Sequence, residues 1–305
     1  GQFGLLEADN DPAVFAALIQ TAELWLVERQ ATQITGPFNL SVNQECGLLV
    51  EGFQTPPSIM MPHGRDWYGR LLEEQGYVPA KDLLAYWAEV DFDPPRVMQS
   101  LIRRYSPRVT LRTLRRKRLK EELGILRDIF NDAWSENWGF VPMTEAEFAE
   151  LGTSLRLFMP DDYVQIAEVD GEPAAFVAAL PNLNEVFADM NGHLLPFGWA
   201  KLFWRLKRQK FSTGRIPLMG IRQHFQNTPL GMALAFMVID AARHALLARG
   251  IYEIEMSWIL EDNSGMRNIL DSIGGKAYKR YRIYQKNLES DIQQHMQCIK
   301  NSNRR

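Results

Sequence analysis

The residues with the strongest potential for chemistry lie between Met219 and Gly250. The stretch MGIRQHFQNTPLGMALAFMVIDAARHALLARG opens apolar, turns polar, and continues with apolar residues at helical spacing. This pattern predicts a strand that feeds a loop lying against a helix N-terminus, with Thr228 as the N-cap. Backbone N–H groups at a helix N-terminus can hold a phosphate. The alternative is an N-capped buried helix that binds nothing.

Carboxylates on a second segment could supply a general base. In IYEIEMSWIL, Glu253, Glu255 and Ser257 share one face of a strand, because side chains alternate along a strand. A carboxylate on a central strand is costly if it is buried without a partner. One interpretation is a functional cleft with Glu255 as the base. The other is a salt bridge on the strand face.

Two further catalytic candidates, Glu45 and His63, lie on a long loop over residues 36–64, GPFNLSVNQECGLLVEGFQTPPSIMMPHG. Loops of this length are uncommon as passive connections. Glu45 and His63, with Asn39 and Asn43, could therefore reach a cleft shared by two domains. The alternative is a self-packed Ω-loop that supports the interface.

Composition excludes several functional classes. The chain has 305 residues and a net charge of −3, which argues against a nucleic-acid binder. Its two cysteines are far apart and its five histidines do not cluster, so we expect no metal site and a reducing, cytoplasmic location. No apolar run reaches transmembrane length.

The order of elements predicts an α/β (mixed α+β) fold with two related domains. The second half reads β-α-α-β-β-β-α-β-α-β, with a hairpin turn at Asp170-Gly171. The first half repeats the last part of this order. We therefore expect the C-terminal part of a first domain at 1–92, a linker at 93–108, a complete domain at 109–288 and a polar tail at 289–305. A first domain that lacks its N-terminal part predicts further residues before Gly1 in the natural protein.

This order, together with its motifs, resembles the GNAT superfamily of acyl-CoA-dependent N-acyltransferases in a tandem arrangement, over nearly the whole chain. In that superfamily each domain is a twisted mixed sheet flanked by helices, and one strand splays from its neighbour to admit the pantetheine arm of CoA. A loop of pattern Q/R-x-x-G-x-G/A then binds the pyrophosphate. Residues 226–231, QNTPLG, match it except that Pro229 replaces the first glycine and removes one N–H donor.

The resemblance implies that the second domain alone binds acyl-CoA as co-substrate, without a metal. It assigns CoA binding to two segments, the loop with its flanks and the start of the next helix: Gly220, Ile221, Arg222, Gln226, Asn227, Thr228, Leu230, Gly231, Met232, Asn263 and Met266. Many members carry a tyrosine acid seven residues after the asparagine. Here that position is Leu270, which puts the tyrosine mechanism in doubt.

An inserted segment points to the kind of substrate. In the helix predicted over Trp199–Lys210, apolar and aromatic residues fall on one face and basic residues on another, as in helices that lie at a membrane surface. The alternatives are a helix that covers the cleft or packs on the other domain, and a wall for a long acyl chain. Residues 96–120 add ten Lys or Arg and no acid, which favours either a solvated helix face or contact with an anionic surface.

These features predict an acyl-CoA-dependent N-acyltransferase that acts on a primary amine, leaning to a lipid-like, sphingoid-type amine. In outline the chain is similar to bacterial ceramide synthases. It would be cytoplasmic and peripheral on the inner face of the membrane. The alternatives are a small-molecule N-acetyltransferase and a non-catalytic CoA-binding scaffold.

Overall fold

The computed structural model describes residues 1–155, 158–208 and 210–289. They form two compact units. Unit 1 comprises residues 1–56, 60–84 and the chain from Tyr278, and unit 2 comprises residues 57–59 and 85–277. The boundaries of these units differ from those of the predicted domains, because unit 1 also includes most of β11 (Lys276–Asn287), which the prediction assigned to the second domain. The domain boundaries therefore stay a prediction, and the predicted tail from residue 290 lies outside the described residues.

Unit 1 is a small sheet with two helices. Its elements are α1 (Pro12–Val27), β1 (Gln33–Gly36), β2 (Phe38–Asn39), β3 (Glu45–Cys46), β4 (Leu48–Glu51), α2 (Tyr68–Glu74), the first part of β5 (Val78–Glu89) and most of β11 (Lys276–Asn287). β11 pairs antiparallel with both β1 and β4, and β2 pairs with β3. Strands from the first and the last parts of the described chain therefore build one sheet.

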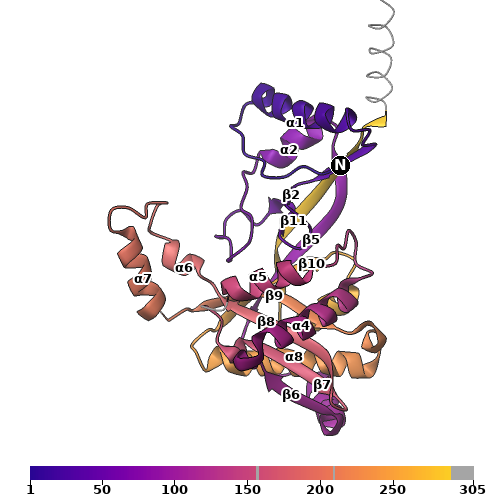
Figure 1. Cartoon of the computed structure of the whole chain (residues 1–305), viewed down its shortest axis with the longest axis vertical. Helices are drawn as coiled ribbons and strands as arrows, with labels where there is room; N and C mark the ends of the chain where they lie inside the picture. The colour runs from indigo at the N-terminus through magenta and orange to yellow at the C-terminus, as the bar shows by residue number, and fades with distance from the viewer. Residues whose placement is uncertain (156–157, 209, 290–305) are drawn as a thin grey trace, which may run out of the picture. The chain divides into compact units, whose positions relative to one another are not determined.

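The core of unit 1 lies between this sheet and its helices. Phe15 and Ile19 of α1 pack with Leu71 of α2 and Tyr284 of β11, and all four are almost fully buried. α1 begins as the sequence predicts, because the Asp11 carboxylate accepts from the backbone N–H groups of Ala13 and Val14. Figure 1 shows α1 and α2 side by side.

Unit 2 holds the larger sheet and most of the helices. Its elements are the end of β5, α3 (Arg96–Tyr105), β6 (Val109–Thr113), α4 (Leu119–Trp134), α5 (Glu145–Leu155), β7 (Val164–Val169), β8 (Glu172–Pro181), α6 (Asn184–Phe187), α7 (Gly198–Arg208), β9 (Thr213–Ile221), α8 (Pro229–Leu247), β10 (Glu253–Leu260) and α9 (Ser264–Ser272). Short 3-10 turns lie at 106–108, 116–118, 161–163 and 223–225.

The sheet of unit 2 runs in the order β10-β9-β8-β7-β6. β10 and β9 are parallel and the other neighbours are antiparallel, so the sheet is mixed as predicted. The predicted hairpin joins β7 to β8 through Asp170 and Gly171, both with positive φ. β8 is buried at every position from Ala174 to Pro181, which requires cover on both faces. α4 packs on β8 and β9, and α8 packs on β7 and β8 (Figure 1).

Candidate functional site

The two parallel strands of unit 2 separate part-way along their length. β9 and β10 pair only from Thr213↔Glu253 to Ile216↔Met256, although β9 continues to Ile221 and β10 to Leu260. Pro217, the next residue of β9, has no N–H with which to continue the ladder. β9 also carries an irregularity against β8 at this point, and such bulges often lie next to active sites. The structure thus contains a split of the kind that the resemblance implies.

The loop after β9 leaves backbone donors without partners. Thr228 caps α8 through its side chain, which accepts from the Gly231 N–H at 3.0 Å. Pro229 stands at the first helical position, where its missing N–H costs little. Within the described part of the chain, the N–H groups of Asn227 and Leu230 have no hydrogen-bond acceptor. They lie at the positive end of the α8 dipole, which favours an anion.

Two of the predicted CoA-binding residues, Gln226 and Gly231, stabilise the conformation of this loop. The Gln226 side-chain amide donates to the carbonyls of Ala133 and Ile221, both at 2.9 Å, and so fastens the loop to α4. At Gly231, a Cβ would lie 2.0 Å from the carbonyl oxygen of Phe225, so only glycine allows this close approach of loop and helix. The glutamine and the glycine of the motif therefore shape the loop.

The second predicted segment lies at the same edge of the sheet. Asn263 caps α9, and its side chain accepts from the Met266 N–H at 3.0 Å. Because the carboxyl ends of parallel strands meet at one edge, the loop after β9 and the start of α9 flank the split from its two sides. The structure brings these segments together, while the binding of CoA by each residue stays a prediction. Leu270 is buried and offers no acid group.

Glu255 is part of a fully buried network. Its carboxylate is 0% exposed, accepts from the Ser257 hydroxyl at 2.7 Å and lies 3.5 Å from Nε of Arg215. Arg215 also donates to Ser257 Oγ and to the carbonyl of Ile59. The salt bridge that we kept as the alternative for Glu255 is therefore present. Its role as the base stays a prediction.

Arg215 is a residue that the sequence analysis missed. Its partner strand offered a signal, because Arg215 lies opposite Glu255 in the parallel register of β9 and β10. An arginine inside the apolar strand RIPLMGI requires a buried acceptor, since an unpaired buried charge is very costly. Pairing the two strands in the sequence analysis would have identified the Arg215–Glu255 cluster.

The other two catalytic candidates belong to unit 1. Glu45 accepts a hydrogen bond from the Asn39 side chain at 3.2 Å. The His63 ring packs edge-on against Phe53, and burial together with the neighbouring Lys279 charge lowers the pKa of His63. The structure thus gives both side chains local partners within unit 1, and their catalytic roles stay predictions.

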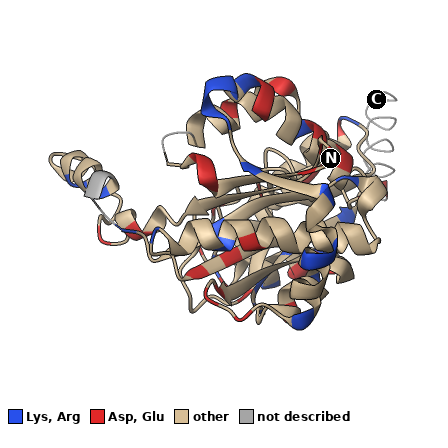
Figure 2. Ribbon diagram, turned by 90° about the horizontal axis from the view of Figure 1, so that it is seen from below, with Lys and Arg blue, Asp and Glu red and all other residues tan. Residues whose placement is uncertain are grey.

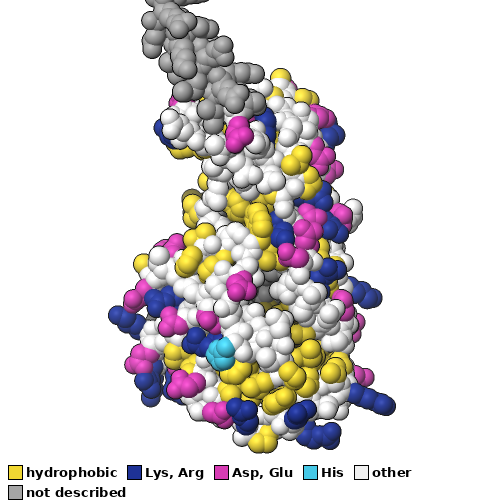
Figure 3. Space-filling model, turned by 90° about the vertical axis from the view of Figure 1, so that its right-hand side faces the viewer, with side chains coloured by type: hydrophobic (Ala, Val, Ile, Leu, Met, Phe, Trp, Pro, Cys, Tyr) yellow, Lys and Arg dark blue, Asp and Glu magenta, His cyan; other side chains and the backbone are white. Residues whose placement is uncertain are grey.

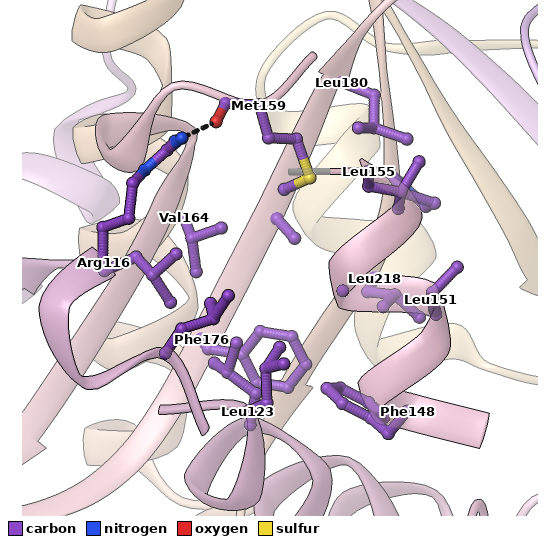
Figure 4. Close-up of a pocket in the computed structure, with 16 residues that line it drawn as sticks. Arg116, Leu123, Phe148, Leu151, Leu155, Met159, Val164, Phe176, Leu180 and Leu218 are labelled. Carbon is purple, nitrogen blue, oxygen red and sulfur yellow. Dashed lines mark hydrogen bonds between the residues drawn. The ribbon is translucent and has the colours of Figure 1, made fainter. Parts of the chain in front are cut away.

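An apolar pocket in unit 2 was not predicted. It lies between α4, α5 and the sheet and holds about 620 Å³ of empty space, counted out to its open mouth. Figure 4 shows the side chains of α5 facing Leu123 and Phe176 across it. The lining residues, apolar except for one arginine, are Leu114, Arg116, Leu119, Leu123, Leu126, Phe148, Leu151, Gly152, Leu155, Met159, Val164, Phe176, Ala178, Leu180, Pro217 and Leu218.

The inserted helix α7 and the residues just before it expose large apolar side chains. Leu195 is 79% exposed, Phe197 78% and Phe203 67%, and Trp199 and Trp204 are also more than half exposed. Figure 2 shows α7 standing away from the rest of unit 2. The structure ends the helix at Arg208, before the predicted end at Lys210.

Several basic residues of α7 and of the run at 96–120 are paired with acidic side chains. Lys201 and Arg205 both bind Asp189, and hydrogen bonds from Arg205 and then Lys201 hold the pKa of Asp189 well below its usual range. In the basic run, Arg112 contacts Glu122 and Glu168. Basic and acidic side chains are likewise interspersed over the face in Figure 3. Ion pairs hold five of the ten basic residues of the run, Arg108, Arg112, Arg116, Arg118 and Lys120, so the solvated face and the contact with an anionic surface both stay predictions.

Two observations concern metal ions and membranes. Among the described residues no three His, Cys, Asp or Glu side chains are grouped so that they could hold a metal ion. α8 is long and apolar enough to cross a membrane by composition, but 61% of its apolar window is buried inside unit 2. A buried core helix passes the same test, so α8 is weak evidence for a span.

Comparison with known proteins places this geometry in a family. Protein YghO of Escherichia coli (strain K12) is 50% identical over 291 residues, which cover 94% of this chain and 74% of YghO. Bacterial ceramide synthase of Caulobacter vibrioides is 47% identical over 289 residues, 94% of this chain and 75% of that protein. The chain belongs to the bacterial ceramide synthase family. No family model matches the sequence.

Solved structures identify the fold of this ceramide synthase family member. The crystal structure of a GCN5-related N-acetyltransferase from Sphaerobacter thermophilus aligns with a TM-score of 0.50 at 15% identity, over 89% of this chain and 67% of that one. At this identity the likeness shows the fold alone. The predicted α/β fold of the GNAT type is thereby confirmed.

Proposed function

We propose that the protein is an acyl-CoA-dependent N-acyltransferase that acylates a lipid-like, sphingoid-type primary amine. The observation that carries the proposal is the split between β9 and β10, which leads to a loop with unpaired N–H groups at the start of α8. The relative named bacterial ceramide synthase supports the lipid-like amine.

The reaction moves the acyl group from sulfur to nitrogen and one proton from nitrogen to sulfur. The neutral amine nitrogen attacks the thioester carbonyl, the N–C bond forms, the C–S bond breaks, and the amine proton leaves through a base while the thiolate becomes CoA-SH. The N–H groups of Asn227 and Leu230 would hold the pyrophosphate. The edge of β9 beyond Ile216 no longer pairs with β10, and a backbone N–H group of this edge that faces the split would stabilise the oxyanion.

Glu255 is the proposed base, because its carboxylate lies at the last paired residues of the two strands, where the split begins. Glu255→Gln keeps an oxygen acceptor for the Ser257 hydroxyl and removes the charge. If Glu255 is the base, we expect kcat to fall about 10²–10⁴-fold with CoA affinity unchanged. If the Arg215 pair is purely structural, the folded variant keeps its kcat and loses stability only.

The test of the function is CoA release by thiol titration. Acetyl-, octanoyl- and palmitoyl-CoA are each offered with sphingoid bases, polyamines and amino acids. We expect release with a long acyl chain and a sphingoid base, and mass spectrometry should find the amide. Release only with acetyl-CoA and a soluble amine would replace the proposal with a small-molecule acetyltransferase. Binding of CoA without release from any pair would favour a scaffold.

A lipid-like amine suggests that the protein works at a membrane surface, peripheral on the inner face, and α7 is the proposed contact. Since Lys201 and Arg205 are already paired with Asp189, the attraction would come from the exposed aromatic side chains more than from charge. Zwitterionic and anionic liposomes should therefore bind the protein to similar extents. Replacing Trp199, Phe203 and Trp204 together with Ser should release it from both; unchanged binding would exclude α7 as the contact.

A further inference from the structure

We propose that the apolar pocket between α4, α5 and the sheet takes the hydrocarbon chain of a long acyl group, and that Gly152 sets how long that chain can be. The proposal rests on the proposed function, because it needs acyl-CoA in the split between β9 and β10. It adds a binding site and a selectivity residue to that function.

The pocket begins where the strands part. Pro217 and Leu218, which line it, directly follow Ile216, the last β9 residue paired with β10. The loop with the unpaired N–H groups follows the end of the same strand. An acyl-CoA whose pyrophosphate lies at that loop and whose thioester lies in the split would therefore have its acyl chain next to the pocket wall formed by Pro217 and Leu218.

The pocket walls are almost entirely apolar, which favours a hydrocarbon chain as the ligand. Among the described residues that line it, Arg116 alone is charged, and its guanidinium binds Asp161 and the carbonyl of Met159 (Figure 4). The pocket is open to solvent at its mouth, so a chain that enters it can extend beyond the enclosed part. A cationic amine head group would find no free acceptor in these apolar walls, which favours an acyl chain as occupant.

Gly152 lets α5 pack closely against Leu123, which also lines the pocket. A Cβ at this position would lie 2.5 Å from Cδ2 of Leu123, on the facing helix α4. A larger side chain would push Leu123 aside and occupy space in the pocket. Ser154, two residues further along α5, is exposed and serves as the matched control position.

The experiment measures affinities of CoA and of an acyl-CoA series from acetyl to palmitoyl by calorimetry, with no amine present. For the natural sequence we expect the affinity to rise about fourfold with each methylene until the pocket is full. Gly152→Leu should weaken palmitoyl-CoA binding at least tenfold, about the value of two methylenes, and leave CoA unchanged. Ser154→Leu should change neither the affinity for palmitoyl-CoA nor the affinity for CoA.

Leu151→Ala, which enlarges the pocket, should move the preference to longer chains and keeps the proposal testable if Gly152→Leu misfolds. Equal affinity across the series, with CoA still bound, would overturn the pocket assignment and leave the proposed function standing. Failure of CoA itself to bind would overturn both. A Gly152→Leu variant with an unchanged acyl-CoA series but a raised KM for long-chain amines would assign the pocket to the amine and overturn the proposal.

Discussion

Two helices of this chain, α1 and α8, begin with the same kind of cap but differ in how well the first turn could bind an anion. α1 and α8 both follow a cap residue with proline, at Asp11-Pro12 and Thr228-Pro229. The Asp11 carboxylate accepts from two N–H groups and places a negative charge at the end of α1. The neutral Thr228 side chain accepts from one N–H group, that of Gly231, and adds no negative charge. The N-terminal end of α8 therefore keeps the positive charge of its helix dipole. The same start signal therefore closes one helix end and leaves the other open to an anion.

The two units also hold carboxylate–arginine clusters in different surroundings. In unit 1, Asp82 accepts from Arg280 and Arg282, whose side chains are partly exposed. In unit 2, Glu255 and Arg215 are almost completely buried. A buried pair depends on both partners far more than a partly exposed cluster does.

The largest effect should come from breaking the buried cluster. Arg215→Met removes a buried cation beside the Glu255 carboxylate, which should lower the free energy of unfolding by about 3–5 kcal/mol. Arg282→Met leaves Asp82 with Arg280 and should cost about 1 kcal/mol. Urea unfolding of both variants tests the contrast, and equal losses would mean that burial does not distinguish the clusters.

The next largest effect concerns the third residue after each cap. Gly231→Ala brings a Cβ against the Phe225 carbonyl oxygen, so the loop must move, at a cost of about 1–3 kcal/mol. We expect CoA binding to be lost with the loop geometry. Val14→Ala, at the same place in α1, should leave stability nearly unchanged. Thermal unfolding and CoA calorimetry measure both, and an intact CoA affinity in Gly231→Ala would separate the loop from CoA binding.

A smaller effect is expected from exchanging the caps. Thr228→Asp gives α8 the carboxylate that α1 has, which should weaken CoA binding about two- to fivefold at low ionic strength by repelling the pyrophosphate. Asp11→Thr in α1 should leave CoA affinity unchanged. The difference should shrink in added salt. A Thr228→Asp affinity equal to that of the natural sequence would show that no anion binds at this helix end.

The smallest effect should be the acid sensitivity of unit 1. Burial alone would raise the pKa of Asp82, but hydrogen bonds from Arg282 and Arg280 outweigh it and lower the pKa below its usual value. The stabilisation is therefore complete above the unfolded-state pKa of about 3.9 and is lost as the pH falls through the lower folded-state pKa. Unfolding curves below pH 5 should show a smaller acid-induced loss for Asp82→Asn than for the natural sequence.

Much of the fold and part of the site followed from local sequence. The Asp11 and Thr228 caps, the Asp170-Gly171 turn and the phosphate-type loop are set by residues next to one another, so the sequence predicts them. Arg215 and the pocket around Gly152 escaped prediction, because their partners come from different strands and helices. Glu255 could be predicted as a buried carboxylate or a base, but its partner depended on strand register.

By itself, the sequence determined where the helices begin, where the hairpin turns and which loop could hold an anion, because caps, prolines and glycines act within a few residues. The tertiary structure decided that β9 and β10 part after Ile216, that Glu255 meets Arg215, and that α5 stands over an apolar pocket. Each of these depends on strand pairing or helix packing between segments far apart in the chain. Such long-range contacts depend on how the side chains of the whole core pack together, which local sequence does not specify.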